Sequence, residues 1–424
     1  MLEKGSYRQV RDMLLCRVSA VGKERADLET CAGRILAEEA VAAADNPPFD
    51  RSPYDGYAFR ARDTEGASAS CPVTLRLVDY IAAGDVAHTG ITKGTAAHLM
   101  TGAPIPPGAD AVLPFERTEF TDRTVTIASA VKAGENVVRA GEDVKKGTVL
   151  CRPGTPVDAG LAGTLAGLGI FHPLVYRQPL VGIISTGTEL LEEDEPPAEG
   201  RIYNTNRYAL QAACAQAGCR TLYLGTARDE EGVISGLIRR ALSEEGCDAV
   251  ILSGGVSVGD YDCTPAAMER AGVEVLARGL SLKPGMAGAF GIFVPDPPEA
   301  GTREENSSAG APGIPVLALS GNPAACMTAF YAVALPVLKK RAGCSRVIPD
   351  QVRVRLDRDY SRKNQSVRLL RGRVEAGEAV LEVTIPEKQG NQMLGSLAGS
   401  NVFVEIPAGT ALRAGETAEG FLIG

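Results

Sequence analysis

The pattern of apolar and polar residues changes along the chain and predicts regions of different structure. From residue 72 to 150, short stretches such as VTLRLVDYI and TVTIAS, separated by Gly, Pro and Asp, predict a small β-rich domain. From residue 179, apolar runs without alternation, such as PLVGIIS and DAVILS, alternate with helical patterns and predict a parallel, doubly wound sheet. After residue 346 the pattern returns to strands with Gly-rich turns, which predicts a β-barrel or sandwich of about eighty residues.

Apolar residues at helical spacing mark the helices that we expect between these strands. Near the N-terminus they predict helices over 6–20 and 24–39, and the Ala/Gly-rich stretch LAGTLAGLG predicts a short helix within 151–177. In the α/β region the predicted helices cover 206–217, 230–243, 264–271 and 324–341.

Composition narrows the class of protein. A chain of 424 residues is long enough for roughly three domains. Its net charge of −8 argues against a nucleic-acid surface, which needs a basic excess. Ten scattered cysteines without CxxC or CxxH, together with only three histidines, make a zinc site an unfavourable interpretation. The charged N-terminal stretch and the short apolar runs predict a cytoplasmic protein that does not bind a membrane.

Three strands of the predicted sheet end in turns rich in small polar residues. These turns are IIS-TGTEL (183–190), ILS-GGVSVGDYD (251–262) and ALS-GNPAA (318–325). Ligands of open α/β sheets bind beyond the carboxyl ends of the strands, where glycines let backbone N–H groups approach them. Tight strand-to-helix turns also need glycine for structural reasons, but three such turns in one sheet favour a ligand. None matches the dinucleotide or P-loop motif, so the turns predict a different anion site.

The same edge of the sheet carries acidic residues: Glu189, Asp229, Asp260 and Asp262. Carboxylates beside a phosphate repel it unless a cation intervenes, and Mg²⁺ binds through one or two carboxylates together with phosphate oxygens. Helix or turn capping is the alternative for Asp229 and Asp260. Lys283, in LKPG, is a candidate point charge for a phosphate or an oxyanion, or else an ordinary exposed lysine at a strand end.

Rigid polar turns also occur in the β-rich region. FDRSPYDGYAFR contains Asp55, LMTGAPIPPGADAV contains Thr101, and GEDVKKG contains Asp143. Prolines stiffen such loops and pre-organise the groups they present, although Asp, Gly and Pro also suit turns that bind nothing.

Seven motifs together identify a family. FDRSPYDGYA, LMTGAPIPPGADAV, GEDVKKG, STGTELL, SGGVSVGDYD, LKPG and SGNPA follow the order found in the molybdopterin molybdenumtransferase (MoeA) family, which includes the E-domain of gephyrin. The chain resembles this family over essentially its whole length. The resemblance implies an elongated homodimer, with each active site between the α/β domain of one subunit and the inserted domain of the other. It also implies a molybdopterin-binding α/β domain (1–21 and 178–343), a helical linker domain (22–44 and 145–177), an inserted β-rich domain (45–144) and a C-terminal β-barrel domain (344–424).

The resemblance also implies a reaction and the residues that perform it. Members of the family take adenylylated molybdopterin and molybdate, cleave the pyrophosphate bond, insert the metal into the dithiolene and release AMP, with Mg²⁺ as the cofactor. Matching positions imply catalytic roles for Asp55, Thr101, Asp143 and Lys283. They imply Mg²⁺ binding by Glu189, Asp229, Asp260 and Asp262. The implied substrate-binding residues are Thr186, Gly187, Gly254, Gly255, Ser257, Pro284, Gly285 and Asn322.

The chain departs from the family pattern at several positions. KPGMA replaces the usual KPGKP at Met286 and Ala287, and SGNPAA replaces PGNPVS at Ser320 and Ala325. A lysine common in the family is Gly279 here. Three alternatives therefore stay open: a catalytically altered paralogue that binds a pterin or nucleotide as a carrier or regulator, an enzyme that uses tungstate, and an interaction scaffold.

Overall fold

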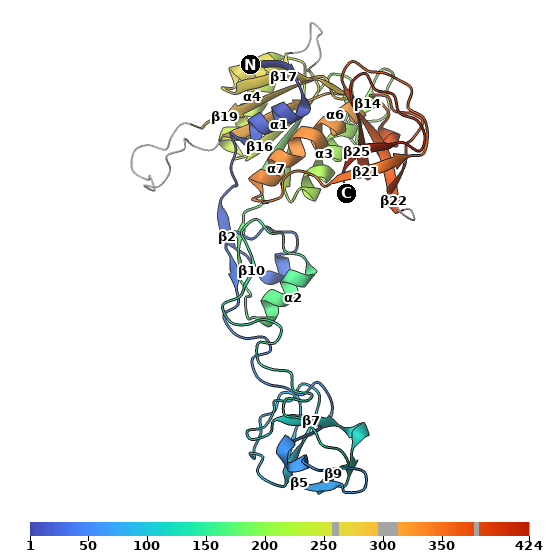
Figure 1. The fold of residues 1–424 in the computed structure, drawn as a ribbon. Helices are drawn as coiled ribbons and strands as arrows, with labels where there is room; N and C mark the ends of the chain where they lie inside the picture. Colours follow the sequence, from blue (N-terminus) through green and yellow to red (C-terminus); the bar gives the residue numbers. More distant parts are fainter. Residues whose placement is uncertain (257–262, 296–312, 377–380, 424) are drawn as a thin grey trace. The chain divides into compact units, whose positions relative to one another are not determined.

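The computed structural model describes residues 1–256, 263–295, 313–376 and 381–423 (Figure 1). Contacts divide the chain into two compact units. The first contains Met1–Glu38, Pro153–Asp158 and Leu174–Gly424, and the second contains Glu39–Arg152 and Ala159–Pro173. The four-domain boundaries given above stay a prediction.

A seven-stranded sheet forms the centre of the first unit, in the order β1-β17-β19-β20-β16-β12-β15. Helices α1, α3, α6 and α7 pack on one face through residues such as Leu14, Leu210, Met327 and Leu338, and α4 and α5 pack on the other through Ile234 and Met268 (Figure 1). The doubly wound architecture is therefore confirmed. The strands are β1 (Leu2–Gly5), β12 (Leu180–Thr186), β15 (Arg220–Ala227), β16 (Ala249–Ser253), β17 (Glu274–Leu280), β19 (Gly288–Phe293) and β20 (Ile314–Leu319). The helices are α1 (Tyr7–Leu15), α3 (Thr205–Gln216), α4 (Glu231–Arg239), α5 (Thr264–Arg270), α6 (Pro323–Ala329) and α7 (Leu335–Arg341).

One strand contradicts the prediction that the sheet is parallel throughout. β19 pairs antiparallel with both of its neighbours, β17 and β20. Only residues 281–287 connect β17 to β19, whereas a parallel connection needs a crossover of about a dozen residues or more. The short connection therefore forces the chain to reverse direction.

The helix predicted over 24–39 is wrong. This segment contains β2 (Lys23–Arg25), which pairs antiparallel with β11 (Leu174–Tyr176), and a single 3₁₀ turn, η1 (Leu28–Thr30). Bridges from Ile35 to Pro156 and from Leu36 to Val175 hold the following residues extended. Pairing with distant segments therefore overrides the helical spacing. The other predicted helices are present, with π turns at Arg240–Glu244 and at Phe330–Ala334, between α6 and α7.

The C-terminal residues form a closed barrel rather than a sandwich. The strands follow the order β22-β23-β21-β25-β24, and β22 also pairs with β24, which closes the ring. A short strand that precedes this region in the chain, β18 (Leu282–Lys283), pairs in parallel with the first two residues of β22, Val367 and Arg368. The barrel strands are β21 (Gln351–Leu356), β22 (Val367–Ala376), β23 (Leu381–Thr384), β24 (Val402–Ile406) and β25 (Thr417–Leu422).

The second unit confirms the predicted β-rich domain. A six-stranded sheet has the order β7-β4-β6-β5-β9-β8, and β3 (Ala40–Val41) pairs separately with β10 (Val149–Cys151). The sheet strands are β4 (Gly56–Phe59), β5 (Val73–Ile81), β6 (Thr95–Leu99), β7 (Ala111–Pro114), β8 (Glu119–Phe120) and β9 (Thr124–Ile127). Helix α2 (Ala159–Gly167) is the short Ala/Gly-rich helix expected from the sequence. Within the described residues, no helix is both long enough and apolar enough to cross a membrane.

Candidate functional site

A cavity of about 1080 Å³ lies in the first unit, beyond the carboxyl ends of β12, β16 and β20. We call it the strand-end cavity. The start of α3 and part of the C-terminal segment, at Gln392 and Leu394, complete its wall. The predicted site residues that line it are Thr186, Gly187, Glu189, Asp229, Gly254, Gly255 and Asn322. All three turns singled out in the sequence therefore meet at one cavity, as expected for an open α/β sheet.

Close contact between neighbouring turns explains the two glycines after β16. Gly254 has φ of +111°, and a Cβ there would lie 2.4 Å from Thr186 Oγ1 and 2.6 Å from Thr186 O. Gly255 has φ of +62°, and its Cβ would lie 2.4 Å from Thr264 Oγ1. Both positions therefore require glycine for structural reasons, and the same close approach shapes the cavity floor.

The described acids fit a magnesium site but do not form a complete one. Glu189 and Asp229 both line the strand-end cavity, whereas Asp260, Asp262 and Ser257 lie outside the described residues. Among the residues that are described, no group of three or more His, Cys, Asp or Glu could hold a metal ion. Two carboxylates are nevertheless the donor set that Mg²⁺ needs when substrate phosphates supply further oxygens.

Asp229 is half-buried in the wall of the cavity and directly precedes Glu230, the N-cap residue of helix α4. The side chain of Glu230 makes no capping hydrogen bond, and capping by Asp229 stays an alternative prediction.

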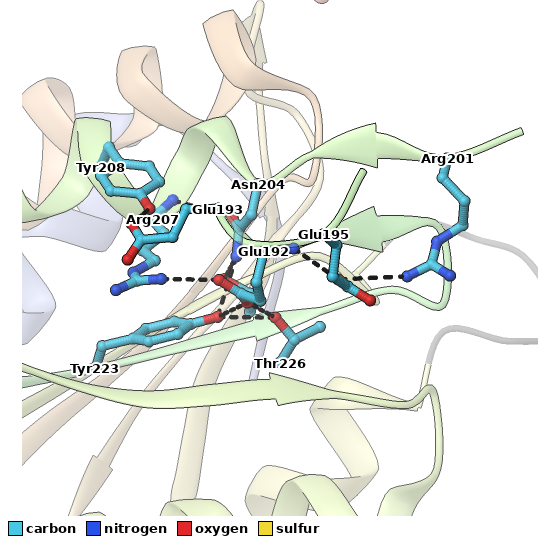
Figure 2. A network of polar contacts seen from close by, with 10 residues as sticks. Glu192, Glu193, Glu195, Arg201, Asn204, Arg207, Tyr208, Tyr223 and Thr226 are labelled. Carbon is cyan, nitrogen blue, oxygen red and sulfur yellow. Dashed lines mark hydrogen bonds and ion pairs between the residues drawn. The ribbon is translucent and has the colours of Figure 1, made fainter. Parts of the chain in front are cut away.

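A polar network fixes the segment between β12 and α3 (Figure 2). The Glu192 carboxylate accepts hydrogen bonds from Tyr223 Oη (2.6 Å), Thr226 Oγ1 (2.6 Å) and Arg207 Nη1 (2.8 Å). Burial by itself raises the pKa of Glu192, but the bonds from Thr226, Tyr223 and Arg207 outweigh it and hold that pKa below its ordinary value. Glu192 therefore stays ionised and holds this wall of the cavity against β15 and α3.

A second cavity, of about 500 Å³, is lined by the first four residues of the KPGMA motif. We call it the basic cavity, because Lys283, Arg362, Lys363 and Arg368 line it and none of its described lining residues is acidic. Lys283 lies opposite Arg368 where β18 pairs with β22. Pro284 and Gly285 belong to this cavity too, so these three predicted site residues lie apart from the strand-end set.

Two buried guanidinium groups carry positive charge here: Arg368 lines the basic cavity, and Arg371 interacts electrostatically with Arg368 but does not line the cavity. Arg368 is only 9% exposed; its Nη2 donates to Gln389 O (2.9 Å), and its Nε has no partner among the described residues. Arg371 is fully buried and donates from Nε to Ser396 Oγ (2.7 Å). Burial, with the nearby charge of Arg368, lowers the pKa of Arg371 to about 10. Buried cations without a carboxylate partner favour the binding of an anion.

The two cavities share a wall. Met286 and Asn391 line the basic cavity, and the residues that follow them in the chain, Ala287 and Gln392, line the strand-end cavity. The carbonyl oxygen of Asn391 also accepts hydrogen bonds from the first amides of α6, Ala324 N (3.0 Å) and Ala325 N (3.3 Å). The SGNPAA turn is therefore tied to the C-terminal segment that separates the cavities.

Two of the three predicted residues of the second unit contact each other, and the third has a different partner. Asp55 Oδ1 accepts hydrogen bonds from Thr101 N (2.6 Å) and Thr101 Oγ1 (2.7 Å), and these two bonds lower the pKa of Asp55. Asp143 Oδ2 accepts from Asn46 Nδ2 (2.9 Å). The structure thus brings Asp55 and Thr101 together and places Asp143 beside Asn46. Thr101 holds a carboxylate in place rather than presenting an isolated hydroxyl.

Comparison with known proteins assigns the whole chain to one family. Residues 6–169 match the MoeA N-terminal region (domains I and II), residues 182–340 a probable molybdopterin binding domain, and residues 353–422 the MoeA C-terminal region (domain IV). The chain belongs to the MoeA family.

Individual relatives agree with this assignment. The molybdopterin molybdenumtransferase of Bacillus subtilis is 34% identical over 438 aligned positions, which span 100% of this chain and 96% of the relative. A molybdopterin molybdenumtransferase of Staphylococcus epidermidis is 33% identical over 91% of this chain and 87% of its own length. The crystal structure of a molybdopterin biosynthesis MoeA protein from Pyrococcus horikoshii superposes with a TM-score of 0.81 at 29% identity, over 99% of both chains.

Sequence reasoning missed several residues of this MoeA protein that line the cavities. Arg362, Lys363 and Arg368 come from the C-terminal region, which the pattern identified only as a β-domain. These three cationic residues all lie within the short stretch SRKNQSVR, and this local positive charge could have indicated an anion site. Asn206, at the start of α3, was hidden within a helical pattern.

Proposed function

We propose that this protein is an enzyme, a molybdopterin molybdenumtransferase, which inserts molybdate into adenylylated molybdopterin and releases AMP in molybdenum cofactor biosynthesis. The proposal rests on the family and on one structural observation. A cavity large enough for a nucleotide-bearing ligand adjoins a smaller cavity lined by cations. The reaction needs this pair of sites, because one substrate is a large dinucleotide-like molecule and the other a small oxyanion.

In this proposal the strand-end cavity holds the adenylylated pterin. The turns after β12, β16 and β20 line it, and Asn322 adds an exposed polar side chain to the wall. Molybdate binds in the basic cavity, where Lys283 and Arg368 offset its two negative charges. Lys363 and Arg362 line the same cavity as Met286 and add positive charge where the chain lacks the family's lysine. The shared wall keeps the two substrates adjacent, which lowers the entropic cost of their reaction.

Magnesium is the proposed cofactor. Glu189 and Asp229 would hold it, and Asp260 and Asp262 are proposed as further ligands from the family pattern. When bound, Mg²⁺ would offset the charge of the pyrophosphate and polarise it for cleavage. Without a cation, the carboxylates of Glu189 and Asp229 would repel that group.

Asp55, Thr101 and Asp143 are proposed to assist catalysis. The two hydrogen bonds from Thr101 keep Asp55 ionised at neutral pH and fix its orientation. Thr101 is therefore a positioning residue, and Asp55 is the acceptor of a proton or a hydrogen bond from substrate. We further propose that the protein is cytoplasmic and forms a homodimer. Sedimentation analysis tests the dimer, because it measures the mass of the particle in solution.

Turnover tests the proposal directly. The protein is incubated with adenylylated molybdopterin, molybdate and Mg²⁺, and AMP release is measured. We expect molybdate-dependent AMP release that stops when Mg²⁺ is chelated. Retained pterin binding without AMP release would overturn the enzyme assignment and support the carrier or regulator alternative. A parallel series with tungstate compares the two oxyanions.

Lys283→Ala tests the placement of molybdate. We expect the apparent KM for molybdate to rise at least about tenfold, the equivalent of about 1.4 kcal/mol, while binding of the adenylylated pterin changes little. Lys93→Ala, which removes an exposed lysine of the second unit, is the control and should leave both unchanged. An unchanged KM for molybdate in Lys283→Ala would show that the oxyanion binds elsewhere.

A further inference from the structure

The segment before α3 presents exposed apolar side chains to the strand-end cavity. Strand β14 (Ile202–Tyr203) pairs in parallel with β13 (Leu190–Leu191). Ile202 is 60% exposed and Tyr203 is 46% exposed, and both line the cavity. A half-exposed aromatic ring in a cavity wall offers a flat apolar face to a ligand.

Hydrogen bonds on several sides hold Tyr203 in place. Its hydroxyl donates to Glu195 O (3.2 Å), and its neighbours Ile202 N and Asn204 N donate to Glu189 O (2.9 Å) and Leu191 O (3.1 Å). The Glu192 network in Figure 2 anchors the same segment to β15 and α3. A ring fixed in this way loses little conformational entropy when a ligand stacks on it.

A buried acceptor lies three residues further on, at Asn206. This side chain is 7% exposed and lines the same cavity. Its Nδ2 donates to Ser253 Oγ (2.6 Å) and to Gly321 O (2.8 Å). A carbonyl oxygen can only accept, so the bond to Gly321 fixes which amide atom is nitrogen. Asn206 Oδ1 then has no partner among the described residues. A buried acceptor without a donor is unfavourable, so a ligand that supplies an N–H is favoured there.

We propose that Tyr203 and Asn206 bind a planar nitrogen heterocycle of the substrate. The ring stacks on Tyr203, and an N–H group at its edge donates to Asn206 Oδ1. The inference rests on the proposed function, because adenylylated molybdopterin carries two such rings, adenine and pterin. Both rings have a flat face and an amino group, so the experiment must distinguish them.

Tyr203→Ala is the first variant, measured by calorimetry with AMP, with a free pterin and with ribose 5-phosphate. We expect affinity for one of the two ring-bearing ligands to fall about 5- to 150-fold, the range of a lost stacking contact. The ligand whose affinity falls identifies the ring that binds here. Ribose 5-phosphate has no ring of this kind, so its affinity should not change.

Matched variants separate stacking from general damage. Tyr208 is 45% exposed, lies in the adjoining helix and is not among the residues of the cavity wall, so Tyr208→Ala is the control. Tyr203→Phe keeps the ring and should bind as the parent does, apart from the loss of the bond to Glu195 O. Equal losses in Tyr203→Ala and Tyr208→Ala, or unchanged binding of both rings in Tyr203→Ala, would overturn the proposal.

The acceptor is tested through the ligand, because replacing Asn206 would also break its bonds to Ser253 and Gly321. An analogue whose exocyclic amino group carries two methyl groups, and for a pterin also a methyl group on the adjacent ring N3, lacks the N–H donors of that edge, and we expect it to bind the unaltered protein at least about tenfold more weakly. Equal binding would refute the role of Asn206. If the ring does not bind at Tyr203 but AMP is still released, the inference fails and the proposed function stands. If ring binding depends on Tyr203 but no AMP is released, only the proposed function fails.

Discussion

Replacing Gly254 by alanine should damage both the stability of the first unit and its ligand binding. The positive φ of +111° is unfavourable for a residue with a Cβ, by about 1–2 kcal/mol. The new Cβ would also meet Thr186 Oγ1 at 2.4 Å and Thr186 O at 2.6 Å. The hydroxyl can rotate away, but the carbonyl belongs to the end of β12, so the ends of β12 and β16 must move apart. Strain and overpacking together predict a loss of about 2–5 kcal/mol in the free energy of unfolding.

The matched control, Gly236→Ala, should raise the free energy of unfolding instead of lowering it. Gly236 is exposed in α4, and apart from its chain neighbours and the backbone of its own helix no described heavy atom lies within 4 Å of the position a Cβ would take. Alanine there should stabilise the helix by about 0.5–1 kcal/mol. Urea denaturation followed by circular dichroism measures both variants, with a separate transition fitted for each unit. AMP affinity should fall only in Gly254→Ala. If Gly254→Ala is as stable as the parent and binds AMP equally well, the described approach of the turns is wrong.

Three further predictions concern other parts of the molecule. Asp248→Asn should lower the free energy of unfolding by about 3 kcal/mol, because it leaves the guanidinium of Arg341, which is only 5% exposed, without its carboxylate partner. Urea denaturation measures the loss, and a loss below about 1 kcal/mol would contradict the prediction. Thr101→Val removes one of the hydrogen bonds that lower the pKa of Asp55, so the acid limb of the pH profile of AMP release should move to higher pH. An acid limb at the same pH would show that the ionisation of Asp55 does not determine it. Burial raises the pKa of Cys326 to about 12, so peptide mapping after alkylation at mildly alkaline pH should find this thiol unmodified until the protein is unfolded.

Local sequence pattern predicted the parts of the fold that local rules control. PLVGIIS and DAVILS became β12 and β16 because continuous apolar runs suit strands covered on both faces. The pattern failed over residues 24–39, where pairing with β11 holds the chain extended. It also failed for β19, whose direction depends on the short connection from β17 rather than on its own residues.

The candidate site shows the same division. Gly254 and Glu189 were predictable because the carboxyl ends of parallel strands meet at one edge of the sheet. Arg368 was not predictable, because it is separated from Lys283 by many residues and joins it only through the pairing of β18 with β22. Among the described residues Asn206 Oδ1 has no partner, and this depends on three segments that meet at the cavity, so no single stretch of sequence predicts it.

The sequence by itself determined the α/β character of the central sheet, the three strand-end turns and the identity of the family. These features depend on apolar periodicity and on motifs that each occupy a short stretch of chain. Only the tertiary structure decided that the cations of the C-terminal barrel join Lys283, and that a second cavity shares a wall with the first. The physical reason is that strand pairing and close packing connect residues far apart in the chain, and local periodicity carries no information about which distant partner each segment finds.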